Sequence, residues 1–581
     1  MNGRWLRRLL AATLLLGAAP TGIGPATPSV DEPRLLVTVG ETTAGSTRLW
    51  LRVESKVARV RVGPAEGEKV VTLEARPDPT RDHTAVVALQ DLKSDVRYVY
   101  EVEAGGTRVS GSFVTSPAPD SDRAVRLAWS GDLGGGGHCR DAEDGYRIFR
   151  AMLRRAPELF LFVGDTIYAD QACGRARHTR MPVSVAGTLD DFRAKHRYNR
   201  TDPLVQAFFR TASVYPIWDD HEVRNNFVGP DEPLMPIGRQ AFQDYFPVVG
   251  PPEEPGRLYR SIRWGRHVEV FILDTRQYRS SNSRPDGPEK TMLGVAQRQW
   301  FLNGVAASTA TWKLVVSSVP LGIFTGGRNA DSWSSANVLG YARAGTGFAH
   351  ERDAILAELR DRAVRNVVFL TGDVHHAEHI RHQPFADYAV HELTAGPLSA
   401  RQGYPRFLDR SLHSRSLTSL GFALNFGEIL ADGATLTANI IDATGAVRGT
   451  TTLRSELRPT ARRRRSAAHK MSGVRMHAAR DGRTQTVGWC DVMSDVPGRL
   501  PDVSRSGTKT DAGRWPRVAN RQAGPLERTQ RTGVRSHHAS KPGHPRFEPC
   551  TRRRCGATIH LNQATHASSR ARAVAAEPPS I

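Results

Sequence analysis

Carboxylates that directly follow short apolar segments constrain the fold of this chain more than any other feature. Leu159–Val163, for example, is followed at once by Gly164-Asp165. The same pattern occurs twice more, at Val125–Ser130 before Gly131-Asp132 and at Val367–Leu370 before Thr371-Gly372-Asp373. A charge at the end of a buried strand is costly unless it is paired or bound to a metal ion. Because α/β sites form at the carboxyl edge of a sheet, the pattern predicts an α/β domain with its site there.

Alternation of strand-like and helix-like segments extends this prediction over residues 123–458. We expect helices at Asp144–Arg155, Gln297–Ala307 and His350–Asp361. We expect strands at Val125–Ser130, Leu159–Val163, Val268–Leu273, Lys313–Ser317, Val367–Leu370, Ala389–Leu393, Phe422–Leu430, Thr435–Asp442 and Gly449–Arg454. The turn at Asp442–Gly445 predicts that the last two strands form a hairpin.

Residues 34–116 have a different pattern, with about seven short β-branched or aromatic segments separated by Gly, Asp and Ser. This spacing is typical of a small all-β sandwich of the immunoglobulin type. The segment contains no cluster of catalytic side chains, so we expect a structural role in covering or orienting the next domain. Pro117–Asp122 has the composition of a linker.

The positive charge of the chain is concentrated at its C-terminal end. Residues 459–581 contain 24 Lys and Arg but 8 Asp and Glu, which gives +16 of the net charge of +21. With no sustained apolar period, this region is predicted to be a disordered basic tail. An electrostatic arm for anionic polymers is the functional alternative. The basic residues are not interleaved with aromatic ones, so we expect no specific reader of nucleic acids.

The first 29 residues have the layout of a signal peptide. Arg4, Arg7 and Arg8 precede the apolar segment Leu9–Ala19, and small residues follow. We therefore expect a secreted or cell-envelope protein, and the Arg7-Arg8 pair permits the twin-arginine route. The apolar segment is shorter than the ~20 residues needed to span a bilayer, and no other segment is longer, so we expect no membrane span.

Two cysteines, Cys139 and Cys173, lie in the predicted domains. In an oxidising compartment they are able to form a disulfide bond. Either residue is alternatively a metal ligand. The sequence leaves both interpretations open.

Five motifs place ionisable side chains at predicted strand ends. They are Ser130-Gly-Asp132, Gly164-Asp-Thr-Ile-Tyr168, Trp218-Asp-Asp-His-Glu222, Leu273-Asp-Thr-Arg276 and Thr371-Gly-Asp-Val-His375. Carboxylate, phenolate and imidazole groups together suit hard and borderline metal ions. Two such ions can clamp a phosphate group and activate a water molecule. A glycosidase needs only two carboxylates, and no Gly-x-Ser-x-Gly elbow is placed before a helix, so those alternatives are weaker.

At these motifs the chain resembles the PhoD-like alkaline phosphatases, which include calcium- and iron-dependent enzymes described as phospholipases D. The resemblance covers about residues 34–455. It depends on Gly164–Asp170, Trp218–Asn226, Leu273–Arg279 and Gly372–His375. It implies a four-layer αββα metallophosphoesterase domain behind a small β domain. It also implies Fe³⁺ and Ca²⁺ as cofactors.

The resemblance implies a role for each matching residue. Asp165 bridges two metal ions, and Tyr168 binds ferric iron as a phenolate. Asp220 stands where related enzymes place a metal-binding Asn, and His375 and Asp373 are further ligands. His221 stabilises the transition state or acts as the acid, Arg276 is a phosphate clamp, and Asn225 orients the site.

The first metal ligand is the one departure from the family pattern. Familiar members carry a Cys soon after the first strand, where this chain has Asp132. Cys139 comes later, after Gly134–Gly137. Asp132 is the first choice as ligand and Cys139 the second, because a Cys139–Cys173 disulfide would remove the thiolate.

These observations predict a secreted phosphoesterase that hydrolyses phosphate mono- or diesters by attack of a metal-bound hydroxide. The expected substrate is a phosphate ester, such as a phospholipid or a wall polymer. A phospholipase D acting on lipid headgroups is the first alternative. A binding module for anionic wall polymers is the second. We expect a monomer.

Overall fold

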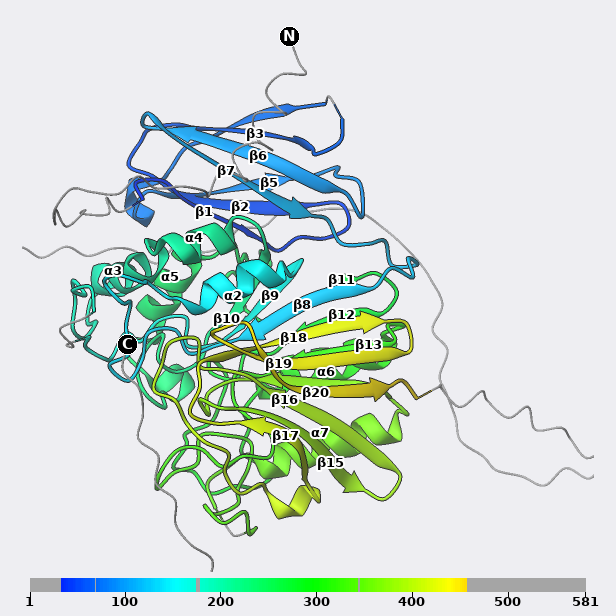
Figure 1. Cartoon of the computed structure of the whole chain (residues 1–581). Coiled ribbons are helices and arrows are strands. Elements are labelled where there is room, and N and C mark those ends of the chain that lie inside the picture. Colours follow the sequence, from blue (N-terminus) through cyan, green and yellow to red (C-terminus); the bar gives the residue numbers. More distant parts are fainter. Residues whose placement is uncertain (1–32, 68, 174–177, 343–344, 457–581) are drawn as a thin grey trace, which may run out of the picture. The chain divides into compact units, whose positions relative to one another are not determined.

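The computed structural model describes residues 33–456 except 68, 174–177 and 343–344 (Figure 1). The predicted signal peptide, residues 1–29, and the predicted tail, residues 459–581, lie outside the described residues. Among the described helices, none combines the length and the apolar composition needed to cross a membrane.

The N-terminal segment forms the seven strands that the sequence predicts. They are β1 (Leu36–Gly40), β2 (Thr47–Arg52), β3 (Ala58–Pro64), β4 (Val71–Ala75), β5 (Thr84–Leu89), β6 (Arg97–Ala104) and β7 (Thr107–Val114). Strands β4-β3-β6-β7 form one antiparallel sheet. Opposite it, β2 pairs with β1 on one side and with β5 on the other. Side chains from both sets share one apolar core, which includes Val37, Leu49, Val60 and Tyr100. The assignment to the immunoglobulin type stays a prediction.

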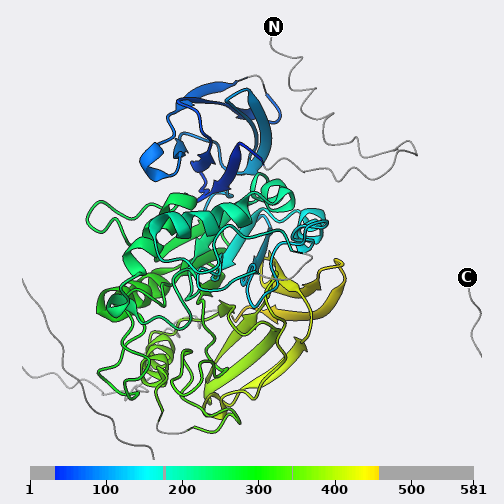
Figure 2. The same cartoon turned by 90° about the vertical axis from the view of Figure 1, so that its left-hand side faces the viewer.

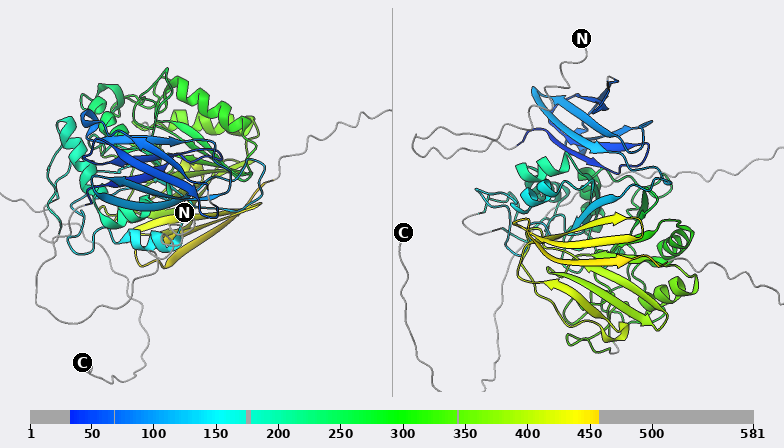
Figure 3. Two further views of the ribbon diagram at one scale, coloured as in Figure 1. Left: turned by 90° about the horizontal axis from the view of Figure 1, so that it is seen from above. Right: turned by 45° about the vertical axis from the view of Figure 1, so that its right-hand side comes forward.

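A nine-stranded sheet joins this module to the rest of the chain, in the order β20-β19-β18-β8-β9-β10-β1-β2-β5. Its further strands are β8 (Val125–Ser130), β9 (Leu159–Val163), β10 (Ser213–Ile217), β18 (Asn425–Asp432), β19 (Thr435–Asp442) and β20 (Val447–Arg454). Strands β8, β9 and β10 are parallel neighbours. β18 lies beside β8 although some 300 residues separate them, as the yellow and cyan arrows in Figures 1 and 3 show. β1 meets β10 at a single pair, Gly40 and Val214.

A second sheet has seven strands in the order β11-β12-β13-β14-β16-β15-β17. The strands are β11 (Arg260–Trp264), β12 (Val268–Ile272), β13 (Trp312–Val316), β14 (Val367–Thr371), β15 (Ala377–Phe385), β16 (Tyr388–Thr394) and β17 (Arg415–Leu420). β12, β13 and β14 are parallel neighbours, so their carboxyl ends meet at one edge. The predicted hairpin also forms, because β19 and β20 pair antiparallel across Asp442–Gly445.

The alternation of side chains in the second sheet explains the layering. Leu314 of β13 joins the core shared with the first sheet, whereas its neighbour Val315 joins a separate core with α6 and α7. The helices are α2 (Ile148–Arg155), α3 (Leu189–Arg200), α4 (Pro203–Phe209), α5 (Met235–Tyr245), α6 (Gly294–Ala307) and α7 (Ala349–Asp361). α2, α4 and α5 contribute to the core of the first sheet. Helices therefore cover the outer faces of two sheets that face each other.

α3, α4 and α5 lie where the sequence analysis predicts no helix. The sequence of α3 is mostly polar, but eight of its residues between Phe192 and Arg200 are buried. A capping box between Thr188 and Asp191 starts the helix. Figure 2 shows these teal helices next to the blue N-terminal strands, and the side-chain amide of Gln206 in α4 accepts a hydrogen bond from the amide of Val37 in β1.

Candidate metal centre and active site

The loops after the parallel strands of both sheets meet at one place. Asp132 follows β8, Asp165 follows β9, and Asp219–His221 follow β10. From the second sheet, Asp373 and His375 follow β14. The prediction that strand ends bring these side chains together agrees with the structure.

Glycines let these loops approach each other. Gly164 has a φ of +114°, and a Cβ there would lie 2.6 Å from the Cβ of Asp219. A Cβ on Gly135 would lie 2.1 Å from the Tyr168 ring. The Gly134–Gly137 segment therefore passes where any side chain at Gly135 would collide with Tyr168.

Two groups of donor atoms are close enough to hold a metal ion. Asp132, Asp165 and His375 form the first, and Asp165, Asp220 and His221 form the second. Within each group the donor atoms lie within 4.8 Å of one another, a separation that one cation bonded at about 2.0–2.6 Å can span. Asp165 belongs to both groups.

Unpaired carboxylate oxygens at this place show that cations fit. Asp132 Oδ2, Asp219 Oδ2, Asp220 Oδ1 and Asp373 Oδ2 are buried and have no hydrogen-bond partner among the described residues. Burial and repulsion from Asp373 raise the pKa of Asp132 well above its usual value. Burial and repulsion from Asp220 do the same to the pKa of Asp165. Metal ions bound here would balance this concentration of negative charge.

The side chains of His375 and Tyr168 point toward the first donor group, which is Asp132, Asp165 and His375. His375 Nδ1 lies 2.6 Å from the carbonyl oxygen of Arg401, which makes Nδ1 the donor and Nε2 an acceptor that faces Tyr168. The Tyr168 hydroxyl lies 3.0 Å from Nε2, and Asp132 Oδ1 lies 3.7 Å from it. A phenol oxygen, an imidazole nitrogen and carboxylates thus converge on one point.

His221 is held by a residue to which the sequence analysis gives no role. Asp170 Oδ1 lies 2.7 Å from His221 Nδ1, and its Oδ2 accepts the backbone amide of Asn225. Burial would lower the pKa of His221, but the charges of Asp220 and Asp170 raise it to about 9. The His221 ring stacks on Tyr168 with 4.2 Å between centroids. Asp170 is thus a positioning residue.

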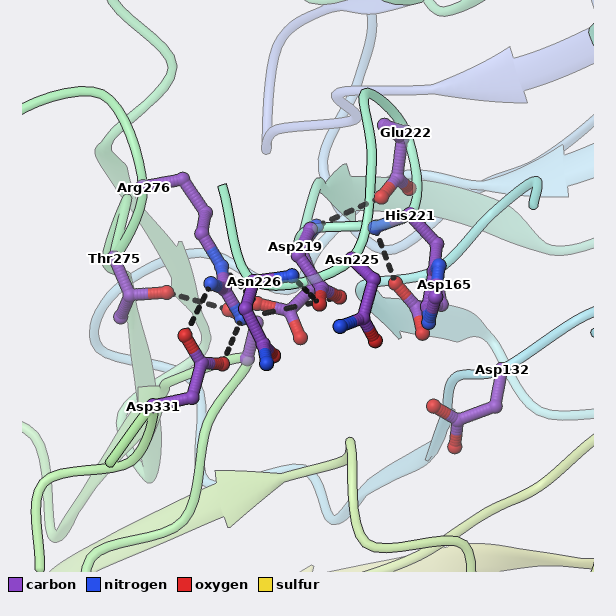
Figure 4. A network of polar contacts seen from close by, with 12 residues as sticks. Asp132, Asp165, Asp219, His221, Glu222, Asn225, Asn226, Thr275, Arg276 and Asp331 are labelled. Carbon is purple, nitrogen blue, oxygen red and sulfur yellow. Dashed lines mark hydrogen bonds and ion pairs between the residues drawn. The ribbon is translucent and has the colours of Figure 1, made fainter. Parts of the chain in front are cut away.

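Arg276 does not fit the predicted role of phosphate clamp. Its guanidinium is fully buried and donates hydrogen bonds to Asp219 and to both oxygens of Asp331. Figure 4 shows this guanidinium among Asp219 and Asp331, with Asp132 lying apart from it. Because each of its three nitrogens is engaged by a carboxylate, Arg276 supports the loop after β10 and does not face the cleft.

Cys139 is also not a thiolate ligand in this structure. It forms a disulfide bond with Cys173. A sulfur in a disulfide has no thiolate to offer a metal ion. Of the two alternatives for the first ligand, the geometry favours Asp132, which lies in a donor group.

A cleft of about 1320 Å³ opens above these groups. Asp165, Tyr168, Asp220, His221 and Asp373 line its base, and Asn225 lies exposed on its wall. Arg401 and Arg406 also line the cleft. The sequence analysis assigns no role to either arginine, since both lie in a loop without a strand-end motif.

Comparison with known proteins agrees with this geometry. The sequence profile of the family described as PhoD-like phosphatase matches residues 136–433, just over half of the chain. The chain belongs to the PhoD-like phosphatase family. The matched range includes Asp165, His221 and His375, whereas Asp132 lies just before it.

A curated relative from Bacillus subtilis (strain 168), named alkaline phosphatase D, is 27% identical over 333 residues. This match covers 51% of the chain and 54% of the relative, so the chain spans about half the length of the curated protein it matches.

Two solved structures share the fold of this PhoD-like chain. The structure titled "Structure of PhoD" has a TM-score of 0.60 at 20% identity and covers 75% of this chain and 95% of its own. A purple acid phosphatase from yellow lupin (Lupinus luteus) has a TM-score of 0.52 at 14% identity, over 73% of this chain and 74% of its own. These likenesses support a metallophosphoesterase-like α/β fold.

Proposed function

We propose that this protein is an exported metallophosphoesterase that hydrolyses phosphate mono- or diesters, with Asp165 bridging two metal ions at the base of the cleft. The observation that carries the proposal is the position of Asp165 in both donor groups. Four buried carboxylate oxygens without hydrogen-bond partners, on Asp132, Asp219, Asp220 and Asp373, support a site for more than one cation.

The donor chemistry supports different ions at the two positions. The first offers the Tyr168 phenol, His375 and two carboxylates, a set that suits ferric iron. The second offers Asp165 and Asp220 oxygens, which suit calcium, with His221 beside them. When bound, the two ions would supply Lewis acidity and lower the pKa of the attacking water.

The chain's own side chains would position the substrate and move its proton. His221, held at Nδ1 by Asp170, presents Nε2 for protonating the leaving alcohol or stabilising charge on the phosphoryl oxygens. Arg401 and Arg406 bring positive charge to the wall next to His375. These two arginines replace Arg276 as our proposal for the groups that attract a phosphate.

Export is part of the proposal because the disulfide and the predicted leader agree with each other. The Cys139–Cys173 bond suits an oxidising compartment. Residues 1–29 carry the charged, apolar and small-residue order of a signal peptide.

A diesterase of the phospholipase D type is the second candidate. The volume of the cleft favours this candidate, because about 1320 Å³ exceeds the range of ~300–1,000 Å³ typical of small-molecule sites. Turnover of phosphatidylcholine against a phosphomonoester discriminates between the two candidates.

The test is a phosphate-release and diester-cleavage screen with the purified full chain, supplied with iron and calcium. The proposal predicts turnover of at least one ester class and loss of that turnover after chelation. Absence of turnover of every ester, in protein shown to contain both metals, would contradict it.

A further inference from the structure

One wall of the cleft carries exposed apolar side chains, unlike its base. Val338, Tyr404, Phe407 and Phe422 line it, with exposed fractions of 68%, 59%, 59% and 72%. Exposed apolar side chains that gather at one place mark sites of interaction. A phosphoryl group held at the two donor groups would leave this wall to another part of the substrate.

Two of these side chains form a stacked pair. The Tyr404 and Phe422 rings lie 5.5 Å apart between centroids, with 22° between their planes. Phe422 has a φ of +54°, a conformation that is costly for a bulky residue. The chain thus holds an exposed ring in a strained backbone position next to the cleft.

The stacked pair is tied directly to a proposed metal ligand. His375 donates through Nδ1 to the carbonyl of Arg401, and its own carbonyl accepts the amide of Gly403 at 2.7 Å. The Gly403 carbonyl in turn accepts the amide of Phe422 at 2.7 Å. Tyr404 and Phe422 are therefore fixed relative to His375 through two short backbone connections.

Positive charge flanks the pair. Arg401 and Arg406 line the same wall, and neither forms an ion pair with a carboxylate within the described ranges 33–67, 69–173, 178–342 and 345–456. Arg406 donates one hydrogen bond to the carbonyl of Phe324. Aromatic faces interleaved with arginines suit flat rings attached to phosphate, because bases stack on aromatic side chains and cations attract the phosphate.

We propose that Tyr404 and Phe422 form a subsite for the alcohol portion of the substrate and that this portion carries a flat ring, as in nucleoside phosphate esters. The inference rests on the proposed phosphoesterase function and adds the substrate class. An extended acyl chain would make less use of a stacked pair of rings, so a nucleoside ester fits this wall better than a lipid.

The experiment compares two esters with the same kind of leaving group, a primary alcohol. Phosphate release from adenosine 5′-monophosphate and from glycerol 3-phosphate is measured with the metal-loaded full chain. The expected ratio of kcat/KM is at least tenfold in favour of the nucleotide, and Tyr404→Ala is expected to reduce that ratio about tenfold. If the enzyme cleaves only diesters, dithymidine monophosphate and bis-glycerol phosphate replace the two esters.

Matched variants separate a role of the ring from general damage. Tyr404→Phe retains the ring and is expected to retain the ratio. Tyr341→Ala removes another half-exposed ring, which lies over Arg410 and does not line the cleft, and is expected to leave both rates unchanged. Circular dichroism and thermal melting verify that each variant is folded.

Two outcomes overturn the inference while leaving the proposed function intact. One is turnover of both esters with equal kcat/KM in the parent and in Tyr404→Ala. The other is an unaltered ratio in Tyr404→Ala together with lost sedimentation with phosphatidylcholine vesicles, which would make the wall a lipid contact. Absence of turnover of any ester would instead contradict the proposed function.

Discussion

Buried carboxylates serve opposite purposes in two regions of this protein. At the junction between the N-terminal module and the helices, Asp244 of α5 is fully buried and each of its oxygens is paired. Arg81 and Gln240 donate to Oδ1, and Arg193 donates twice to Oδ2. Around the candidate metal centre, Asp132, Asp219, Asp220 and Asp373 each keep one buried oxygen without a hydrogen-bond partner.

The difference shows how the same residue type is used for architecture and for chemistry. A paired buried carboxylate holds two segments together and has no capacity left for a ligand. An unpaired one is unfavourable until a cation arrives, so it is retained where binding is the function. The predictions below test this division, from the largest expected effect to the smallest.

Asp165→Asn should lower turnover at least a thousandfold, because the amide removes the charge that both donor groups share. The fold should survive, since the substitution relieves repulsion among buried carboxylates. Steady-state rates and a thermal melt without metal measure the two effects. A variant that is unfolded, or one that keeps near-normal turnover, would contradict the assignment.

Asp244→Ala should lower the free energy of unfolding by about 3–5 kcal/mol, because it leaves Arg193 buried without its carboxylate. Chemical denaturation measures the loss. Glu74→Ala provides the control, since the exposed Glu74–Arg59 pair should contribute less than about 1 kcal/mol. Equal effects of the two substitutions would show that the junction does not depend on its buried charges.

Removal of the metals by chelation should destabilise the protein by about 3–4 kcal/mol if they are present at 100–1,000 times their dissociation constants. The reason is that the cleft carboxylates repel each other without cations. Differential scanning calorimetry with and without chelator measures the change in melting temperature. An unchanged melting temperature would argue against resident cations.

Asp170→Asn should lower kcat about 10- to 100-fold with little change in KM, since Asp170 orients His221 and the bond at Nδ1 is 2.7 Å long. Metal content should stay unchanged, because Asp170 lies in neither donor group. A parallel loss of bound metal would instead make Asp170 part of the metal site.

The sequence predicts the seven N-terminal strands and most of the parallel strands because their side chains are apolar and β-branched. It does not reveal α3, where Arg193, Lys195 and His196 are buried by pairing and stacking that only the folded chain supplies. β15 is missed for the same reason, since Glu378, His379 and His382 are buried within it.

Sequence-based prediction of the cleft residues is limited in the same way. Its proposed ligands follow strands and carry motifs, so the sequence already marks Asp132, Asp165, Asp220 and His375 as candidates. The predicted role of Arg276 does not fit its contacts, and the sequence gives no sign of this because its partner Asp331 lies 55 residues away in a loop. Arg401, Tyr404 and Phe422 face the cleft only because backbone bonds tie their loops to His375.

The most direct measurement of the central claim is the metal content of the purified full chain and of Asp165→Asn, determined by elemental analysis. The account predicts about two metal ions per parent chain, iron and calcium, and a clear loss of metal in the variant. A variant that retains both ions in full and remains active would contradict the bridging role of Asp165.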